Sequence, residues 1–335
     1  MTTNQNDPII NLTTPPGLCG NTCTLGGFLF YWREIMERQT YELDCKKFKS
    51  IDEQINILKD RGLVIGDVSK AKEFLYHNNY YRVSGYSLTL RNHDIFYPNT
   101  KFQNIIDIYN FDQEIRNLLL KYIEIIEIKI KSIFTYEFTK RHGGVGYLEN
   151  SHFSCSDEYN SILCKANKQV EKRKSHEAYL KHFIEELKRP ISMWAYIDLF
   201  TISDISRLYG IAENDIQICV ASEFGLKHGT AVDTMRKFLH CITIIRNLCA
   251  HGSRLYNRLF ITKPSLNKYE QAILIKDDSG NPDNSRLFGF IINIKRLLSK
   301  DQFLSFKNDI MKLESKYPFV DMKHYGFCKD WSRVI

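Results

Sequence analysis

The chain has 335 residues, of which 43% are hydrophobic and 25% charged, a balance typical of soluble globular proteins. This length allows two domains, or one large domain with a substantial core. The formal net charge of +7 permits nucleic-acid binding but is too small to demand it. The sequence begins with no secretory signal pattern and has no apolar run near the roughly 18 residues of a membrane span. We therefore expect a cytoplasmic protein without a membrane partner.

The cysteines are nine in number and follow no disulfide framework. Cys219, Cys241 and Cys249 lie inside apolar helical runs, which favours reduced thiols that pack as small hydrophobes. Cys19 and Cys23 form the only close pair, and no second cysteine pair or histidine pair stands at a zinc-ligand spacing. The sequence therefore predicts no metal site and no cofactor.

The first part of the chain divides into a variable lead-in, residues 1–45, and a small helical unit, residues 46–100. Thr, Asn, Pro and Gly dominate the start of the lead-in, and Phe28–Trp32 suggests a short docking helix. In the helical unit, a capping box at Ser50–Glu53 opens a helix that ends at Gly62.

A second helix of this unit begins at Asp67 or Ser69 and ends near Asn79. Two helices joined by a tight connection resemble a helix-turn-helix, although such hairpins are also common packing units. The stretch Tyr80–Tyr86 is aromatic and contains Arg82. It is either an RNA-contacting surface, with Arg82 on phosphate, or an aromatic hinge that packs one lobe on the other.

The longest predicted helix covers about Gln103 to Arg141 and stops at Gly143. Because it is unusually long, we expect a break near Asn110 or within Glu124–Lys131. Glu127 and Lys131 have the spacing of an ion pair on one helix face. Glu124 or Glu127 could pair with Arg246, the arginine of a later helix. Alternatively, these glutamates belong to a solvated helix face.

Later segments are also helical, so the predicted fold class is mainly α. Lys165–His182 is the densest positive stretch and is either a footprint for RNA phosphates or a solvated helix face. Its predicted RNA-binding residues are Lys165, Lys168, Lys172, Arg173 and Lys174. Other helices are expected from Ser192, from Ser203 to Gly210, over Arg286–Leu298, and from a cap at Asp301 to before Pro318. A loop is expected at Lys276–Asn284. A minor strand pair is expected at Leu63–Ile65 or at Leu259–Ile261.

A helix from Ala231 onward carries the residues with the clearest chemistry. Its apolar positions recur at helical spacing and predict one buried face: Met235, Phe238, Leu239, Ile242, Ile245 and Cys249. Arg246 lies at the margin of that face, where a charge is costly unless it is paired or used. Asn247 and His251 are four residues apart and share a side of the helix. Gly252 is the residue type that follows a helix end.

Arg246 and His251 project about 140° apart on a regular helix, so one chain does not easily direct both at a small target. Two copies of the helix across a two-fold axis would bring two arginines and two histidines into one cleft, which predicts a homodimer with a composite site. Arginine binds phosphate and histidine moves protons near neutral pH, a set suited to metal-independent phosphodiester cleavage. RNA supplies its own 2′-hydroxyl nucleophile. The alternative is a core ion pair for Arg246 and helix-end interactions for His251.

The string Ile245–His251, with Arg254–Arg258, resembles the Abi family of abortive-infection proteins, of AbiD/AbiF type. The arrangement Arg246-Asn247-x3-His251 resembles the RNase motif of the HEPN superfamily (higher eukaryotes and prokaryotes nucleotide-binding domain). The likeness covers about Lys46 to Trp331. Its other motifs are Asn79–Tyr86, Phe111–Arg116, Ile123–Ile128 and Gly326–Trp331. Gly252 and Tyr256 depart from the pattern, which often has histidine and tryptophan there.

This resemblance implies a HEPN-like helical bundle over residues 101–335 and a ribonuclease that leaves 2′,3′-cyclic phosphate ends during phage defence. It assigns His251 as general acid/base, Arg246 as phosphate clamp and Asn247 as the residue that orients His251. Arg254 and Arg258 either contact phosphates or form salt bridges. The resemblance also implies restraint by a small non-coding RNA seated on the basic helix, and a more distant likeness to type VI CRISPR effectors points the same way.

Two other functions fit the same residues. The first is a non-catalytic RNA-binding or regulatory protein of a defence or toxin–antitoxin system, in which the motif has a structural role. The second is regulation by nucleotidyl or AMP transfer, which would need a partner chain to supply carboxylates.

Overall fold

The computed structural model describes residues 47–227 and 229–335. The predicted lead-in, the run Phe28–Trp32 and the Cys19–Cys23 pair therefore lie outside the described residues. Residues Ile51–Ile335 form one compact unit, and the account below concerns that unit. Within it the structure is mainly α-helical, which confirms the predicted fold class.

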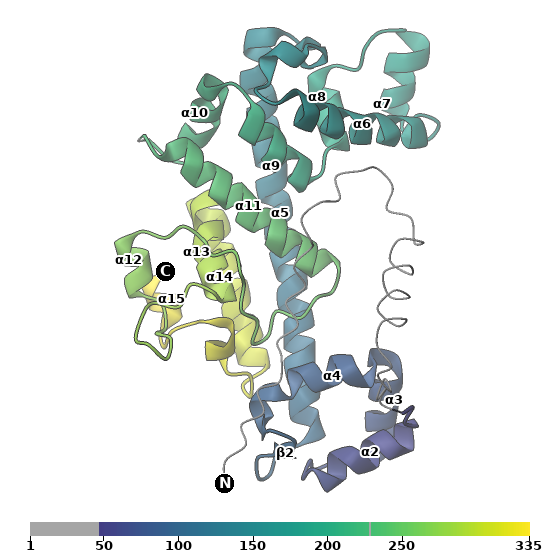
Figure 1. Ribbon diagram of the computed structural model, residues 1–335, viewed down its shortest axis with the longest axis vertical. Helices are drawn as coiled ribbons and strands as arrows, with labels where there is room; N and C mark the ends of the chain where they lie inside the picture. Colours follow the sequence, from purple (N-terminus) through teal and green to yellow (C-terminus); the bar gives the residue numbers. More distant parts are fainter. Residues whose placement is uncertain (1–46, 228) are drawn as a thin grey trace, which may run out of the picture. The chain divides into compact units, whose positions relative to one another are not determined.

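Helix α5 (Phe102–His142) is the spine of the unit (Figure 1). Its 41 residues, at about 1.5 Å each, give a length of roughly 60 Å. Helices α4, α8, α9, α10, α11 and α14 all pack against it. The predicted break is wrong, because the segment has no Gly or Pro and neighbouring helices bury it along its length. It ends, as predicted, at Gly143, whose φ is +72°.

Helices α2 (Ile51–Asp60), α3 (Val68–Asn78) and α4 (Tyr80–Tyr86) gather at the N-terminal end of α5 (Figure 1). The side chain of Asp67 caps α3 by accepting a hydrogen bond from the Lys70 N–H at 2.9 Å, as predicted. Asn79, with a φ of +58°, separates α3 from α4 and caps α4. The α2–α3 hairpin is thus confirmed, and its binding to nucleic acid stays a prediction. The proposed domain boundary at residue 100 also stays a prediction, and α4 packs against α5 across it.

A small hairpin follows α4 and the 3₁₀ turn η1 (Leu88–Leu90). Strand β1 (Arg91–Asn92) pairs antiparallel with β2 (Ile95–Phe96), with Arg91 opposite Phe96. The strand pair predicted at Leu63–Ile65 or Leu259–Ile261 is wrong. Val64 makes only an isolated bridge to Lys101, and the side chain of Ile261 is fully exposed. The hairpin forms instead at a turn where His93 adopts a φ of +50°.

The opposite end of α5 carries a group of short elements and the basic helix α6 (Figure 1). They are η2 (Gly146–Leu148), η3 (Asn150–His152), α6 (Ser156–Arg173), α7 (Ala178–Lys181), the π-turn η4 (His182–Glu186), α8 (Met193–Tyr196) and η5 (Ile197–Leu199). Helix α6 packs on α9 (Ile202–Ile211), which begins at a Thr201–Asp204 capping box.

The remaining helices complete the core around α5. Helix α10 (Asn214–Ser222) precedes α11 (Ala231–Ala250), which crosses α5 and contacts α9, α10 and α13 (Figure 1). The C-terminal part contains α12 (Lys268–Ala272), α13 (Leu287–Leu297), α14 (Lys300–Lys316), η6 (Met322–Tyr325) and α15 (Trp331–Val334). Ser299, rather than the predicted Asp301, caps α14, because its side chain completes a capping box with Gln302. No helix of the described residues is long and apolar enough to cross a membrane.

Candidate functional site

Helix α11 buries the face that its sequence predicts. Met235, Phe238, Leu239, Ile242, Ile245 and Cys249 are all buried. Burial raises the pKa of the Cys241 and Cys249 thiols to about 12, so these cysteines remain protonated and act as small hydrophobes, as expected. The buried face fixes the rotation of α11 and thereby the direction of its polar side chains.

Arg246 is half-buried at the edge of this face and lines a groove of about 770 Å³. Glu124 and Glu127 of α5 line the same groove. Glu127 forms its predicted ion pair with Lys131 at 2.9 Å. Among the residues that the structure describes, neither Arg246 nor Glu124 forms an ion pair. Arg246 thus reaches a groove with its guanidinium available.

The rest of the groove contains exposed aromatic side chains. Tyr136 of α5 is 64% exposed, and Trp194 of α8 is 59% exposed. Trp194 lies against Gly144, where an added Cβ would come within 2.8 Å of its ring. Asp198 also lines the groove, so the groove contains both acidic and basic side chains. The distinctive feature of the groove is the pair of accessible aromatic rings beside Arg246.

His251 forms the C-terminal cap of α11, and its side chain is exposed. Its backbone N–H donates to the Asn247 carbonyl at 3.0 Å, and Gly252 then turns the chain with a φ of +63°. In the described part of the chain, the side chains of Asn247 and His251 form no hydrogen bond with each other. The orienting role of Asn247 stays a prediction.

One chain does not bring Arg246 and His251 into a common pocket. Arg246 lines the groove between α11 and α5, whereas His251 lies outside the lining of that groove. This is the arrangement that the angular spacing on α11 predicts. Joint action of the two side chains on one phosphate across two copies of the chain stays a prediction.

The segment that follows His251 is anchored by the buried carboxylate of Asp112 on α5. This carboxylate accepts hydrogen bonds from the backbone N–H groups of Leu255 and Tyr256, the shorter of them 2.7 Å, and forms an ion pair with Arg116. The hydroxyls of Tyr86 and Tyr325 donate to it at 2.8 and 3.0 Å. We call this set of residues the Asp112 hub.

The electrostatics of the Asp112 hub follow from its burial. Burial raises the pKa of Asp112, and the charge of Arg116 and the surrounding hydrogen bonds oppose this shift. Burial, reinforced by the charge of Asp112, also raises the pKa of Tyr86 and Tyr325. The two phenols therefore stay neutral donors. The hub joins the separate motifs Asn79–Tyr86 and Phe111–Arg116, yet the sequence assigned no role to Asp112.

Three arginines predicted to bind RNA lie around the turn after α11, and two of them, Arg82 and Arg254, connect this turn to α4. Arg82 donates to the Gly252 carbonyl at 2.5 Å and to the Tyr109 hydroxyl at 3.3 Å. Arg254 donates to the Gly85 carbonyl at 2.5 Å. Arg258 donates to the Arg254 carbonyl at 3.2 Å, and burial lowers its pKa. Each guanidinium retains further N–H groups, so a role in RNA binding stays a prediction.

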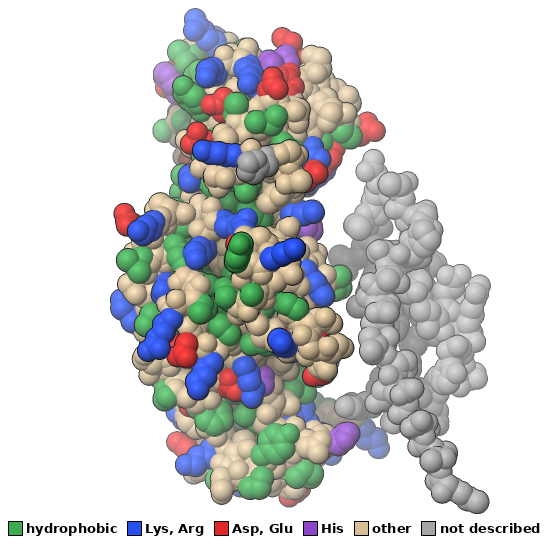
Figure 2. All heavy atoms as spheres, turned by 90° about the vertical axis from the view of Figure 1, so that its left-hand side faces the viewer, with side chains coloured by type: hydrophobic (Ala, Val, Ile, Leu, Met, Phe, Trp, Pro, Cys, Tyr) green, Lys and Arg blue, Asp and Glu red, His purple; other side chains and the backbone are tan. Residues whose placement is uncertain are grey.

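The basic residues of α6 and its C-terminal end are all exposed: Lys165, Lys168, Lys172, Arg173 and Lys174. Lys174 pairs with Glu171 at 2.7 Å and Lys165 with Asp204 at 3.6 Å. Helix α6 lies near the C-terminal end of α5 (Figure 1), whereas the segment after His251 is hydrogen-bonded to Asp112 in the N-terminal part of α5. Figure 2 shows that one face of the unit also carries Lys and Arg side chains along its length, with Asp and Glu among them.

Comparison with known proteins identifies the family. The model of the Abi-like protein family matches residues 73–257, more than half of the chain. The match includes α4, the Asp112 hub residues of α5, the groove and the end of α11. Neither the curated proteins nor the solved structures contain a significant match. The chain therefore belongs to the family of Abi-like proteins, a membership that implies a role in abortive infection.

Proposed function

We propose that this Abi-like protein is a metal-independent endoribonuclease of HEPN type, with Arg246, Asn247 and His251 as its catalytic residues. The observation that carries the proposal is the end of α11. There, Arg246, which has no ion-pair partner among the described residues, is followed five residues later by the exposed His251. A structural role would favour an arginine engaged in an ion pair. Arg246 has none among the described residues and reaches an open groove instead.

In the proposed reaction, the 2′-hydroxyl of RNA attacks the adjacent phosphorus, and the bond from phosphorus to the 5′-oxygen breaks. His251 takes the proton of the 2′-hydroxyl or supplies one to the leaving 5′-oxygen, and the second proton exchanges with solvent or a second His251. Arg246 stabilises the charge on the phosphoryl oxygens. The products are a 2′,3′-cyclic phosphate and a 5′-hydroxyl.

The groove beside Arg246 supports RNA as the substrate. Tyr136 and Trp194 present exposed rings, and stacking of a base on an aromatic ring is worth about 1–3 kcal/mol. Trp194 also supplies a fluorescence signal that can be assigned by difference, because Trp331 is buried and the third tryptophan, Trp32, is present both in wild type and in a Trp194→Phe variant. Addition of a short single-stranded RNA should quench the fluorescence of Trp194. The Trp194→Phe variant should lose the part of the quenching that Trp194 contributes.

The test of catalysis is cleavage of a mixed RNA ladder by the full-length protein in EDTA, after removal of any nucleic acid that co-purifies. Wild type should cut and leave cyclic phosphate ends, whereas His251→Ala should not cut and should still bind RNA. His240→Ala, a change at another exposed histidine of α11, is the matched control. Equal cutting by wild type and His251→Ala would disprove the site assignment. RNA binding without cutting by either protein would favour the non-catalytic RNA-binding function.

We also propose a homodimer in which Arg246 of one copy acts with His251 of the other. An equal mixture of Arg246→Ala and His251→Ala chains tests this directly. If the sites are composite, the mixture should show about a quarter of wild-type activity. Random pairing makes half of all dimers mixed, and each mixed dimer has one intact site out of two. If each site lies within one chain, the mixture stays inactive.

A small non-coding RNA that restrains the enzyme is proposed to bind the basic face of α6. Lys168→Glu with Lys172→Glu should weaken RNA binding and reduce its dependence on salt, because phosphate contacts release counterions. Lys312→Glu, a change at an exposed lysine of α14, is the control. If the α6 variant and Lys312→Glu weakened RNA binding equally, the effect would be one of general charge. The proposal that α6 is the specific RNA-binding site would then be wrong.

A further inference from the structure

Two histidines and a glutamate converge at the C-terminal end of α5, at the end of the unit opposite α2–α4. His142 is the last residue of α5, His152 the last of η3, and Glu213 the N-cap of α10. One donor atom from each lies within 4.8 Å of the other two. The ring centroids of the two histidines are 3.7 Å apart. The groove beside Arg246 does not include any of the three.

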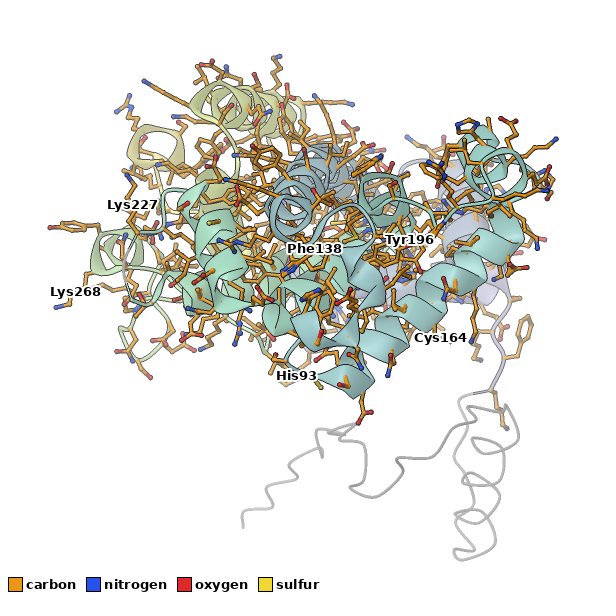
Figure 3. The ribbon with its side chains drawn as sticks, turned by 90° about the horizontal axis from the view of Figure 1, so that it is seen from above. His93, Phe138, Cys164, Tyr196, Lys227 and Lys268 are labelled. Carbon is orange, nitrogen blue, oxygen red and sulfur yellow. The ribbon has the colours of Figure 1, made fainter. Side chains whose placement is uncertain are left out.

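The backbone around the three residues is well fixed. Phe138, which is labelled near the centre of Figure 3, packs against both histidines, with its ring 4.9 Å from that of His142 and 6.2 Å from that of His152. At Gly146, an added Cβ would lie 2.4 Å from the Cβ of His142, so the chain passes this histidine without room for a side chain. After His152, a bridge between Phe153 and Ala212 holds the loop against the start of α10.

The donor atoms have the geometry of ligands rather than of a hydrogen-bonded set. His142 Nε2 is buried and has no hydrogen-bond partner in the described residues, although Glu213 Oε2 is only 3.3 Å away. The carboxylate is therefore close to this nitrogen but off the line along which the ring would donate. Two ligands of a tetrahedral zinc ion, each about 2.0–2.2 Å from it, stand about 3.3–3.5 Å apart in this way.

The second histidine has its two nitrogens in different environments. His152 Nδ1 lies 3.6 Å from Glu213 Oε1, and its Nε2 lies 3.4 Å from Glu149 Oε2. A proton on Nε2, facing Glu149, leaves the lone pair of Nδ1 directed toward the cluster. A carboxylate behind a metal-binding histidine commonly fixes the tautomer and orients the ring in this manner.

We propose that His142, His152 and Glu213 bind a zinc ion, with Glu149 as the residue that positions His152. Two imidazole nitrogens and a carboxylate oxygen suit Zn²⁺, and water would complete the tetrahedron. The ion connects the end of α5 to η3 and to the start of α10, so its role is to fix this end of the spine. The ligands are widely and irregularly spaced in the sequence. That spacing is the reason the sequence predicted no metal site.

The test is a zinc titration of the full-length protein after treatment with a chelator and removal of the chelator. Wild type should bind one zinc ion that His152→Ala and Glu213→Gln do not bind. Glu149→Gln should weaken binding about 10–100-fold, the usual effect of losing such a supporting carboxylate. His182→Ala, which changes an exposed histidine paired with Glu186, should bind as wild type does.

Two further measurements separate this site from the cysteines and from loss of the fold. Co²⁺ bound by nitrogen and oxygen gives visible bands without the thiolate charge-transfer absorption that cysteine ligands would add. Zinc in large excess should raise the Tm of wild type by about 5 °C and leave the Tm of His152→Ala unchanged. Comparison of the metal-free Tm values shows whether a variant is folded. Zinc binding that survives in both folded variants, or no zinc binding by wild type, would overturn the proposal.

Discussion

The Asp112 hub makes a strong prediction about stability, because a buried ion pair loses one partner when Asp112 is changed to Asn. The side chain of Asp112 is fully buried and that of Arg116 is 5% exposed. Asn cannot carry the charge that compensates Arg116, and its amide nitrogen donates where the native oxygen accepts. Breaking a buried pair in this way costs about 3–5 kcal/mol. For a unit of this size we expect a Tm about 10 °C lower.

Thermal and urea unfolding followed by circular dichroism measure this effect, since the unit is mainly helical. Asp309→Asn is the matched control, because its charged partners Lys121 and Lys312, at 3.1 and 3.6 Å, are 61% and 79% exposed. Asn can still accept the hydrogen bond that the Tyr122 hydroxyl donates to Asp309. A surface pair of this kind should contribute less than about 1 kcal/mol. Addition of Arg116→Met to Asp112→Asn should recover part of the lost stability by removing the uncompensated charge.

The reasoning would be refuted if Asp112→Asn destabilised the unit no more than Asp309→Asn does. It would also be refuted if Arg116→Met added a further loss to Asp112→Asn, because the charge of Arg116 would then not be the source of the cost.

Two smaller changes test other parts of the structure. Gly252→Ala places a side chain at a φ of +63°, which should cost about 1–2 kcal/mol and displace the turn after His251; an unchanged Tm would contradict the strain argument. Burial lowers the pKa of His324 below 6.5, so the unfolded chain binds more protons and stability falls as the pH drops below about 6.5. His324→Gln should reduce the difference in urea stability between pH 7.5 and pH 5.5, and an equal difference in both proteins would show that another group is responsible.

The sequence predicted the helices well where local signals are strong. The buried face of α11, the Asp67 cap of α3 and the end of α5 at Gly143 all follow from spacing, capping and glycine. The continuity of α5 could not be predicted, because the neighbours that stabilise it come from α4 through α14. The β1–β2 hairpin was missed because its strands are only two residues long.

The candidate site was predictable only in part. The angle between Arg246 and His251 follows from helix geometry, and His251 lies outside the lining of the groove that Arg246 reaches, as that angle predicts. The role of Asp112 was not predictable from periodicity, because its partners Tyr86 and Tyr325 lie 26 and 213 residues away. Long-range hydrogen bonds of this kind leave no local trace in a sequence.

The Asp112 hub also has a consequence for synthesis of the protein. Tyr325 completes the hub, and it leaves the ribosome long after the α11 segment that contains His251. Contacts between residues so distant in the chain form late, since the intervening chain must first be made and closed. The turn that follows His251 therefore gains its full set of anchors only after Tyr325 has been synthesised. A growing chain that has not yet reached Tyr325 thus lacks one of the hydrogen bonds that hold Asp112, the residue that anchors this turn.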